Sequence, residues 1–497
     1  MTGPTHDEQG NALPEPQEPQ VESKSKQRPL WLNVTLFSAA VAAAVCTYLF
    51  LPEDLPVPEG FVSDQPARLM AAIFALALVL WVTEAIPLFA TSLLVIMCES
   101  WLIATAGETL DVNYRIVLAA FSSPIIWIFL GGFILAKSIQ REGLDVQMAA
   151  FMLRPFGSRP PMMMAGMMLI TALFSMFMSN TATTAMMIIL VAPLLKQLST
   201  ADPFRKGIVL AIPFAANIGG IGTPIGTPPN AVAIGQLEKT QGISIGFAEW
   251  MAVGVPLLLG TLLVMWLALA LLFRSEKKAL HVALPQGFKL TRNAVIVYAT
   301  FAITVTLWLT GTFTGLPTAV VAVVPAALLT MTRIIGRSEF NTLEWDILML
   351  IAGGIALGTG ITSTGLDQWI VGVLPGDDVS LFLLVAAFCV LGVTLSTVMS
   401  NSVAANLLIP IALVVVAARP DVGTVDIAVL AIVTAVTTSF AMGLPISTPP
   451  NAIAYGSGEI DSRDMLKVGG ICSLLATVFI VLTGPFVVGQ ILGVFGR

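Results

Sequence analysis

Repeated apolar runs constrain this chain more than any other feature of its sequence. Stretches of about 20 apolar residues, the length that a helix needs to cross a hydrocarbon core of roughly 30 Å, recur from Leu30 to the C-terminus. Runs such as 70–81 and 257–273 are apolar on every face, whereas membrane-spanning strands alternate apolar and polar residues. Only 11% of the 497 residues are charged, against roughly a quarter in an average soluble protein. The pattern predicts an all-α polytopic membrane protein surrounded by membrane lipid.

Breaks at proline, glycine and charged residues divide the apolar sequence into about 11 transmembrane helices. We expect them near 30–51, 67–86, 88–105, 116–137, 205–236, 250–273, 293–312, 316–335, 344–365, 426–456 and 466–493. Two further apolar stretches, 161–198 and 380–418, have polar residues at their middles and are predicted to be re-entrant helical hairpins. Residues 1–28 are poor in large apolar side chains, which predicts a disordered tail.

The positive charges are distributed unevenly along this arrangement. With the N-terminus in the cytoplasm, 19 of the 24 Lys and Arg residues fall on the cytoplasmic side and the remainder (24 − 19) fall outside. Positive residues concentrate on the cytoplasmic side of membrane proteins. We therefore predict a multi-pass protein of the inner or plasma membrane with a cytoplasmic N-terminus, an external C-terminus and hairpins that enter from opposite faces.

The second half of the chain repeats the first at a constant spacing. The separation between Asn180 and Asn401 (401 − 180) equals the separation between Asn230 and Asn451 (451 − 230). Each copy has an odd number of crossings, so two inverted-topology repeats are expected. The predicted organisation is a cytoplasmic tail at 1–28, a first span and external loop at 29–66, repeat 1 at 67–273 (hairpin 161–198, broken helix 205–236), a cytoplasmic linker at 274–292, and repeat 2 at 293–493 (hairpin 380–418, broken helix 426–456).

Two polar tripeptides at the middles of the hairpins, 179–181 (Ser-Asn-Thr) and 400–402 (Ser-Asn-Ser), stand out from the apolar sequence. Each is followed by a Thr-Pro-Pro-Asn loop, at 227–230 and at 448–451, and the distance along the chain is the same in both cases (227 − 179 and 448 − 400). Paired prolines break a spanning helix because they lack backbone donors. Irregular backbone is tolerated at membrane depth only where it lines a cavity or is buried in protein. The pattern predicts that both tips and both breaks meet at a binding site near the midplane.

The chemistry of these breaks suits anions and sodium. Ser, Thr and Asn are good N-caps and Pro suits a first turn, so each break should begin a half-helix whose positive N-terminal end attracts anions. Freed carbonyls and side-chain oxygens can replace water around sodium. The two histidines, His6 and His281, lie outside the spans, and no Lys or Arg falls at mid-membrane. Because an uncompensated charge there is costly, a small dianion would need co-bound cations, with sodium favoured over protons.

Other functions have less support. An intramembrane hydrolase would need a base or a metal beside its nucleophile, and no His, Lys or Asp pair stands near the tips at mid-membrane. A passive anion channel stays an alternative, and the polar tips could also be ordinary hydrogen-bonding contacts between helices. The net charge of −6 provides no basic surface for nucleic acid. We therefore expect neither an enzyme nor a nucleic-acid-binding protein.

Four segments resemble the divalent anion/sodium symporter family, whose members carry succinate, malate, fumarate, citrate or sulfate. They are the stretch 81–94, the tips at 179–181 and 400–402, and the stretch 439–456. The resemblance implies sodium-coupled symport of C4-dicarboxylates by a homodimer. In it, a transport domain that holds both tips slides as an elevator against a fixed scaffold. Some relatives are sodium-independent exchangers of di- or tricarboxylates, which keeps that alternative open.

The resemblance also implies the residues that bind ligands. One sodium ion would be held by Ser175, Ser179, Asn180 and the carbonyl of Gly226, and a second by Ser396, Asn401 and the carbonyls of Met399 and Ser447. Substrate carboxylates would meet Asn180, Thr181, Asn401 and Ser402, with Thr227 and Pro449 nearby. The family's second tip usually ends in Thr, whereas this chain has Ser402. The loss of a methyl group there leaves the exact substrate open.

Overall fold

The computed structural model describes residues 29–51, 64–106, 113–280, 290–373 and 379–495, and in these residues every regular element is a helix. Ten of the described helices are long and apolar enough to cross a membrane. The prediction of an all-α polytopic membrane protein is therefore confirmed. The tail predicted at 1–28 lies outside the described residues, as do parts of the first external loop and of the linker. The terminal orientation and the division into repeats stay predictions.

The ten apolar helices follow the expected runs closely. They are α1 (Leu30–Phe50), α2 (Gln65–Thr83), α3 (Leu88–Ala106), α4 with α5 (Tyr114–Leu118 and Pro124–Arg141), α9 (Phe204–Gly219), α11 (Phe247–Leu272), α12 (Arg292–Leu309), α16 (Trp345–Ser363), α18 (Leu381–Val398) and α22 (Ser462–Val494). One expected span, 316–335, is shorter, namely α14 (Thr318–Met331), and the expected broken helix 426–456 corresponds to α20 (Thr424–Thr438) together with α21 (Pro449–Gly456). Conversely, α18 is long enough to span although it was expected to be one arm of a hairpin.

Each expected hairpin is a pair of helices joined by a short turn. The first consists of α7 (Pro160–Ser175) and α8 (Asn180–Leu195), and the second of α18 and α19 (Asn401–Ala417). At the start of the second arm, the hydroxyls of Ser179 and Ser400 accept hydrogen bonds from the backbone N–H groups of Ala182 and Val403, each at 3.3 Å. These side-chain caps satisfy N–H groups that a helix start leaves without partners. How deeply the turns enter the membrane stays a prediction.

The two broken helices follow the hairpins. In the first, α9 leads through a short 3₁₀ turn at Gly220–Gly222 to α10 (Pro228–Gln241), and in the second, α20 leads through an irregular segment to α21 (Pro449–Gly456). Proline occupies the first turn of both α10 and α21. That position suits proline because the first N–H groups of a helix have no partner within it.

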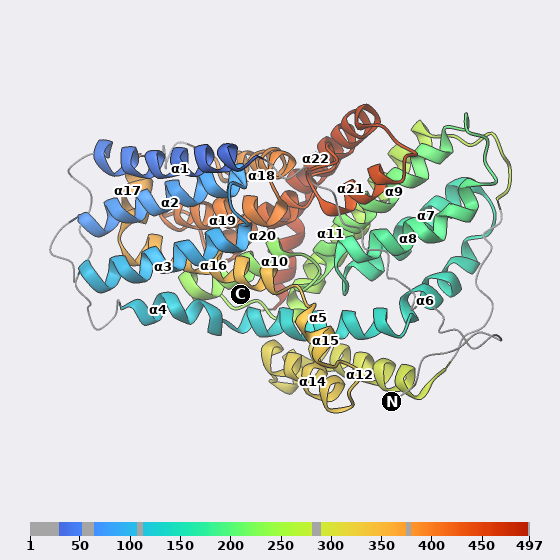
Figure 1. Ribbon diagram of the computed structural model, residues 1–497, viewed down its shortest axis with the longest axis horizontal. Helices are drawn as coiled ribbons and strands as arrows, with labels where there is room; N and C mark the ends of the chain where they lie inside the picture. Colours follow the sequence, from blue (N-terminus) through green and yellow to red (C-terminus); the bar gives the residue numbers. More distant parts are fainter. Residues whose placement is uncertain (1–28, 52–63, 107–112, 281–289, 374–378, 496–497) are drawn as a thin grey trace.

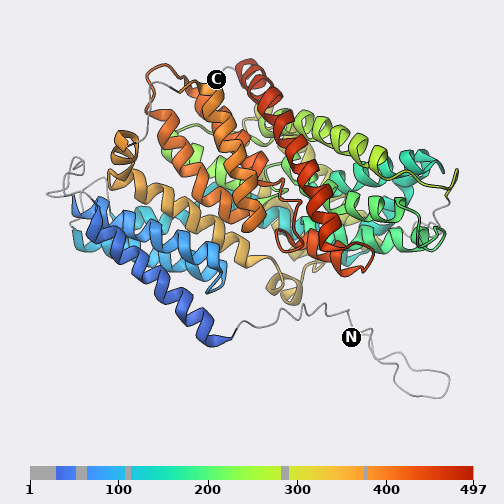
Figure 2. The same cartoon turned by 90° about the horizontal axis from the view of Figure 1, so that it is seen from above.

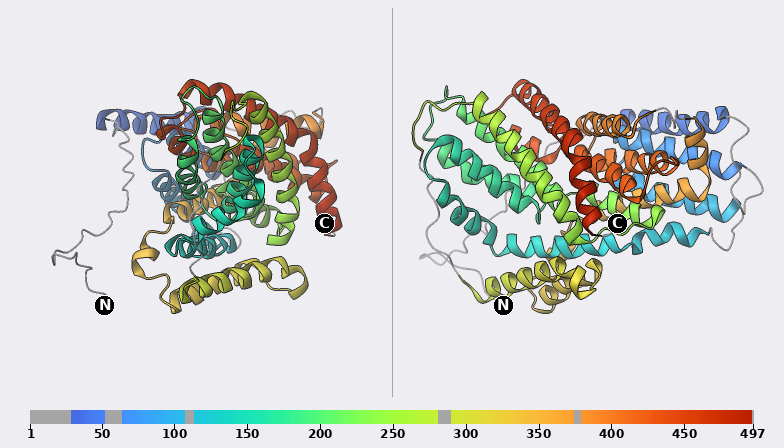
Figure 3. Two further views of the ribbon diagram at one scale, coloured as in Figure 1. Left: turned by 90° about the vertical axis from the view of Figure 1, so that its right-hand side faces the viewer. Right: turned by 180° about the vertical axis from the view of Figure 1, so that it is seen from behind.

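The helices pack into groups that place these breaks at the centre (Figure 1). One end of the molecule holds α1, α2 and α3, and the other holds α6 (Leu144–Leu153), α7, α8 and α9. Figure 2 shows α22 crossing obliquely between the group of α18, α19 and α20 and the group of α7, α8 and α9. It contacts α11, α18 and α20. The pair α12 and α14 forms an outer layer against α5 (Figure 3).

Candidate functional site

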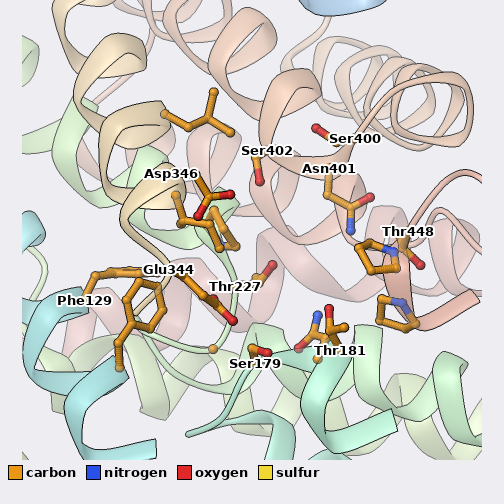
Figure 4. Close-up of a pocket in the computed structure, with 18 of the residues that line it drawn as sticks. Phe129, Ser179, Thr181, Thr227, Glu344, Asp346, Ser400, Asn401, Ser402 and Thr448 are labelled. Atoms are coloured by element: carbon orange, nitrogen blue, oxygen red, sulfur yellow. The ribbon is translucent and has the colours of Figure 1, made fainter. Parts of the chain in front are cut away.

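Both hairpin turns and both helix breaks line one cavity of about 430 Å³. The first tip contributes Ser179 and Thr181, and the second contributes Asn401 and Ser402 from the other half of the chain (Figure 4). Thr227 comes from the first break. The structure thus brings together four interruptions that are far apart in the sequence.

Most of the residues expected to bind ligands lie on the wall of this cavity. They are Ser179, Asn180, Thr181, Gly226, Thr227, Asn401, Ser402, Ser447 and Pro449. Three others do not line it: Ser175, Ser396 and Met399. Ser175 is fully buried, with its hydroxyl within hydrogen-bonding distance of Asn180 Oδ1 and 2.8 Å from the carbonyl oxygen of Ala216. The roles of all these residues as ligands stay a prediction.

Ser396 and Met399 lie behind the second tip. The Ser396 hydroxyl donates to the carbonyl oxygen of Val393, 3.2 Å away and one turn earlier in α18. Met399 ends that helix, where its N–H donates to the carbonyl oxygen of Leu395 at 2.9 Å. Both bonds use only the hydrogen of the donor, so they leave the lone pairs of the Ser396 hydroxyl and the carbonyl oxygen of Met399 unaffected.

A buried asparagine helps to hold the first break in shape. The side-chain Nδ2 of Asn230, fully buried in α10, donates to the carbonyl oxygens of Gly220 at 2.9 Å and Thr223 at 2.7 Å. The unwound segment folds back so closely that a Cβ added at Gly226 would lie 2.4 Å from the carbonyl oxygen of Gly220. Only glycine fits there without displacing backbone. This side chain satisfies two buried carbonyls of the break, and the indole N–H of Trp250 donates to a third, that of Ile221, at 3.0 Å.

The second break is held by the same pattern. Asn451 Nδ2 donates to the carbonyl oxygens of Ala441 at 2.9 Å and Leu444 at 3.0 Å. Each residue of this pattern lies the same number of residues after its counterpart in the first break: Asn451 after Asn230, Ala441 after Gly220, and Leu444 after Thr223 (451 − 230, 441 − 220 and 444 − 223). The recurrence therefore extends from residue types to individual hydrogen bonds.

Each hairpin is tied to its own break by a hydroxyl group. The Thr223 hydroxyl donates to the carbonyl oxygen of Met176 at the first tip. At the second, the Ser447 hydroxyl donates to the carbonyl oxygen of Thr397 at 2.6 Å. The acceptors Met176 and Thr397 are separated along the chain by the same number of residues as Asn230 and Asn451 (397 − 176 and 451 − 230). The donors, Thr223 and Ser447, do not share this separation. Tip and break are thereby held together in each half.

Asn217 connects the two halves and was not singled out from the sequence. It is buried in α9, lines the cavity, and places its Nδ2 3.4 Å from Asn451 Oδ1 and 3.5 Å from the Thr448 hydroxyl. The sequence feature that could have identified Asn217 is its amide side chain within the apolar run 207–218. Such a residue is expensive in a membrane unless it has polar neighbours.

Helix starts are a source of positive potential at the cavity. The helices α8, α10, α19 and α21 all begin at residues on its wall. The N-terminus of a helix carries about half a positive charge and exposes free N–H groups that bind anions. Among the described residues that line the cavity there is no Lys, Arg or His. An anion would therefore be held by backbone and neutral side chains.

Two carboxylates lie on the cavity wall, although the sequence showed no acidic pair near the hairpin tips. Glu344 and Asp346, at the start of α16, both line the cavity. Figure 4 shows them on the side opposite Asn401 and Thr448. The apolar pattern placed both residues at the edge of the span 344–365. It could not show which face of the helix start they occupy.

The oxygen atoms around the cavity suit a hard cation such as sodium. The Oδ1 atom of Asn401 is buried and has no hydrogen-bond partner among the described residues. An unsatisfied buried acceptor costs free energy unless a ligand completes its interactions. In the described part of the chain no group of three His, Cys, Asp or Glu residues is arranged to hold a metal ion. The oxygens on the cavity wall are amide, hydroxyl, carbonyl and carboxylate oxygens.

Comparisons with known proteins agree with a transport function. A family model described as citrate transporter matches residues 78–437. The sodium-dependent dicarboxylate transporter SdcS of Staphylococcus saprophyticus is 32% identical over 473 residues, covering 85% of this chain and 87% of that protein. The protein of the same name from Staphylococcus aureus strain USA300 is 31% identical, covering 90% and 89%.

Two solved structures share the fold at low sequence identity. The crystal structure of the YdaH transporter of Alcanivorax borkumensis matches with a TM-score of 0.52 at 14% identity, covering 82% of this chain and 98% of that one. The MtrF structure of Neisseria gonorrhoeae also has a TM-score of 0.52, at 12% identity and coverages of 92% and 94%. These likenesses concern the arrangement of helices alone.

Proposed function

Because the chain belongs to the citrate transporter family, and so to the divalent anion/sodium symporters that its motifs resemble, we propose that it carries C4-dicarboxylates across the membrane together with sodium ions. Family membership makes it a multi-pass membrane transporter and not an enzyme. What we propose beyond family membership is the substrate, a C4-dicarboxylate, and the coupling ion, sodium. Relatives named as sodium-dependent dicarboxylate transporters support both.

The observation that carries this proposal is the meeting of four helix starts at one cavity. A dianion such as succinate needs positive potential at both of its carboxylates. Helix ends supply it from opposite halves of the chain, through Asn180 and Thr181 on one side and Asn401 and Ser402 on the other, with Thr227 and Pro449 beside them. A cavity of about 430 Å³ lies in the range of small-molecule sites.

Two sodium ions would complete the charge balance. We assign the first to Ser175, Ser179, Asn180 and the carbonyl of Gly226, and the second to Ser396, Asn401 and the carbonyls of Met399 and Ser447. The contact between Ser175 and Asn180 supports the first assignment. The unpartnered Oδ1 of Asn401 supports the second. The Ser396 hydroxyl can keep its hydrogen bond to the carbonyl oxygen of Val393 and offer an oxygen lone pair to an ion.

We further propose that the two halves are inverted repeats and that the protein works as a homodimer by an elevator movement. The hydrogen bonds of Asn230 and Asn451, whose donors and acceptors share one offset along the chain, support the duplication. In this scheme both hairpins and both broken helices move together with the cavity. The cytoplasmic N-terminus and external C-terminus belong to the same proposal.

Uptake of labelled succinate into proteoliposomes tests the transport proposal. With an inward sodium gradient we expect concentrative, saturable uptake, and with potassium in place of sodium we expect none. Equal uptake under both conditions would refute sodium coupling and favour the exchanger, which would show uptake only against internal di- or tricarboxylate. Uptake that neither saturates nor shows counterflow would indicate an anion channel.

A further inference from the structure

Helix α16 contacts both the fixed and the moving parts of the proposed elevator. It packs against α3, which like α16 lies outside the hairpins and broken helices, and also against α10 and α19 (Figure 1). In the proposed movement α10 and α19 travel with the cavity, because they belong to the first broken helix and the second hairpin. Since α16 is long enough to span the membrane, α10 and α19 would move along it.

Two glycines on α16 lie directly beneath polar side chains of the moving helices. A Cβ added at Gly354 would lie 1.9 Å from Asn406 Oδ1, and one added at Gly358 would lie 2.1 Å from Gln236 Oε1. Residues four apart lie on the same face of a helix, so these two glycines form one face of α16. The amide groups therefore rest on bare backbone, where a larger residue would displace them.

The two amides belong to different halves of the chain, and both donate to α16. Gln236 Nε2 in α10 donates to the carbonyl oxygen of Gly354 at 2.7 Å, and Asn406 Nδ2 in α19 donates to that of Leu350 at 3.2 Å. The two acceptors are one turn apart (354 − 350). Both amide side chains are fully buried, and neither lines the cavity. Their contacts are with the α16 backbone and not with the site for ligands.

The oxygen atom of each amide has no hydrogen-bond partner among the described residues. The surface of a helix offers carbonyl oxygens with a lone pair to spare but no free N–H groups, so α16 cannot satisfy these acceptors. A buried acceptor without a partner costs free energy. Apolar side chains of the same size would make a more stable contact, which indicates that the polar groups serve another purpose.

The repeat of the helix backbone supplies that purpose. Carbonyl oxygens recur along α16 once in each turn, about 5.4 Å apart. An amide that moves along the helix can leave one carbonyl and donate to the next, but between them its N–H groups have no acceptor. We propose that Gln236 and Asn406 are positioning residues that hold the moving helices at defined positions along α16 and so limit the rate of translocation. The inference rests on the proposed elevator movement and adds the residues that set its speed.

The test changes the two sides of this contact in turn and measures initial uptake of labelled succinate at saturating sodium and succinate. Gln236→Met keeps the length of the side chain without the amide, so the rate should rise by about threefold or more. Gly358→Ala adds a methyl group that must pass α10, so the rate should fall by about tenfold or more. A residue that served packing alone would lower the rate in both variants. Succinate affinity with sodium present, measured by thermal stabilisation, should stay at the wild-type value.

A second pair and two controls make the test independent of one variant. Asn406→Leu should also raise the rate, and Gln236→Ala combined with Gly358→Ala should regain most of the rate that Gly358→Ala loses, because the shorter side chain leaves room for the methyl group. The controls lie in α17 (Leu366–Val373): Gln368→Met removes an exposed amide, and Gly372→Ala adds a Cβ that meets nothing within 4 Å. Both controls should transport as the wild type does.

The outcomes separate this inference from the function on which it rests. If Gln236→Met and Asn406→Leu bind succinate normally but transport no faster than the wild type, the positioning role is refuted, whether or not Gly358→Ala folds. Loss of succinate binding in these two variants would refute it as well, because the amides would then support the site. If the wild type itself shows no sodium-dependent uptake, the proposed transport function fails instead.

Discussion

Replacing Asn230 by alanine should destabilise the transporter although the residue is not on the cavity wall. Its side chain donates to two carbonyl oxygens of the first break, Gly220 at 2.9 Å and Thr223 at 2.7 Å, and it is fully buried. Alanine would leave both carbonyls without this donor. The segment would then have to rearrange or remain unsatisfied.

The expected magnitude follows from these two bonds. A buried hydrogen bond contributes about 1 kcal/mol net, and an acceptor left buried without a partner costs about 1–3 kcal/mol. Side-chain hydrogen bonds between membrane helices average about 0.6 kcal/mol, which sets the lower bound. We therefore expect a loss of roughly 1–4 kcal/mol for Asn230→Ala. Because Asn451 makes the equivalent pair of bonds, Asn451→Ala should lose a similar amount.

The assay is thermal unfolding of purified protein in detergent, with and without sodium and succinate. Both variants should melt several degrees below the wild type and should recover part of the difference when ligands are present, because ligands that bind only the folded state stabilise it. Asn341→Ala, at an exposed position at the end of α15 (Arg337–Asn341), is the matched control. Wild-type melting of both Asn230→Ala and Asn451→Ala would refute the idea that these amides hold the breaks.

Three further predictions concern the cavity itself. Asn180→Ala and Asn401→Ala should each abolish succinate uptake while leaving a folded protein that elutes as the wild type does in size-exclusion chromatography; full uptake by either variant removes that residue from the site. Gly226→Ala should lower sodium-dependent uptake at least tenfold, because the new Cβ would lie 2.4 Å from the Gly220 carbonyl oxygen, and normal kinetics would show that the break can relax. Ser402→Thr should shift relative uptake of citrate and succinate by a few fold through one added methyl group, and an unchanged ratio would show that the position does not set substrate size.

The sequence predicted the parts of the fold that depend on local pattern. Apolar runs located the helices because the bilayer requires about 20 residues for each crossing. Paired prolines located the breaks because they cannot continue a helix. The length of α14 was overestimated, since apolar residues beyond Met331 belong to a turn. Hydropathy alone does not distinguish an apolar turn buried in protein from a helix end.

The side chains that face the cavity were harder to predict. Asn180 and Asn401 were found because their motif recurs, whereas Asn217 occurs in a single run and gave no repeat signal. The carboxylates of Glu344 and Asp346 were missed because residues at the start of a span are usually solvated. Only the packing of α16 against both halves shows that they turn toward the cavity.

The amide of Asn217 has a consequence for how the two halves respond to ligands. It lies within 3.5 Å of the Thr448 hydroxyl and 3.4 Å of the Asn451 oxygen, and Asn451 is the residue that holds the second break. A movement of the end of α9 beside the unwound segment would therefore change the contacts of Thr448 and Asn451 in the opposite half directly, without an intervening helix. Two ions that each tighten one break would bind cooperatively, and the dependence of uptake on sodium concentration would be steeper than that of two independent sites.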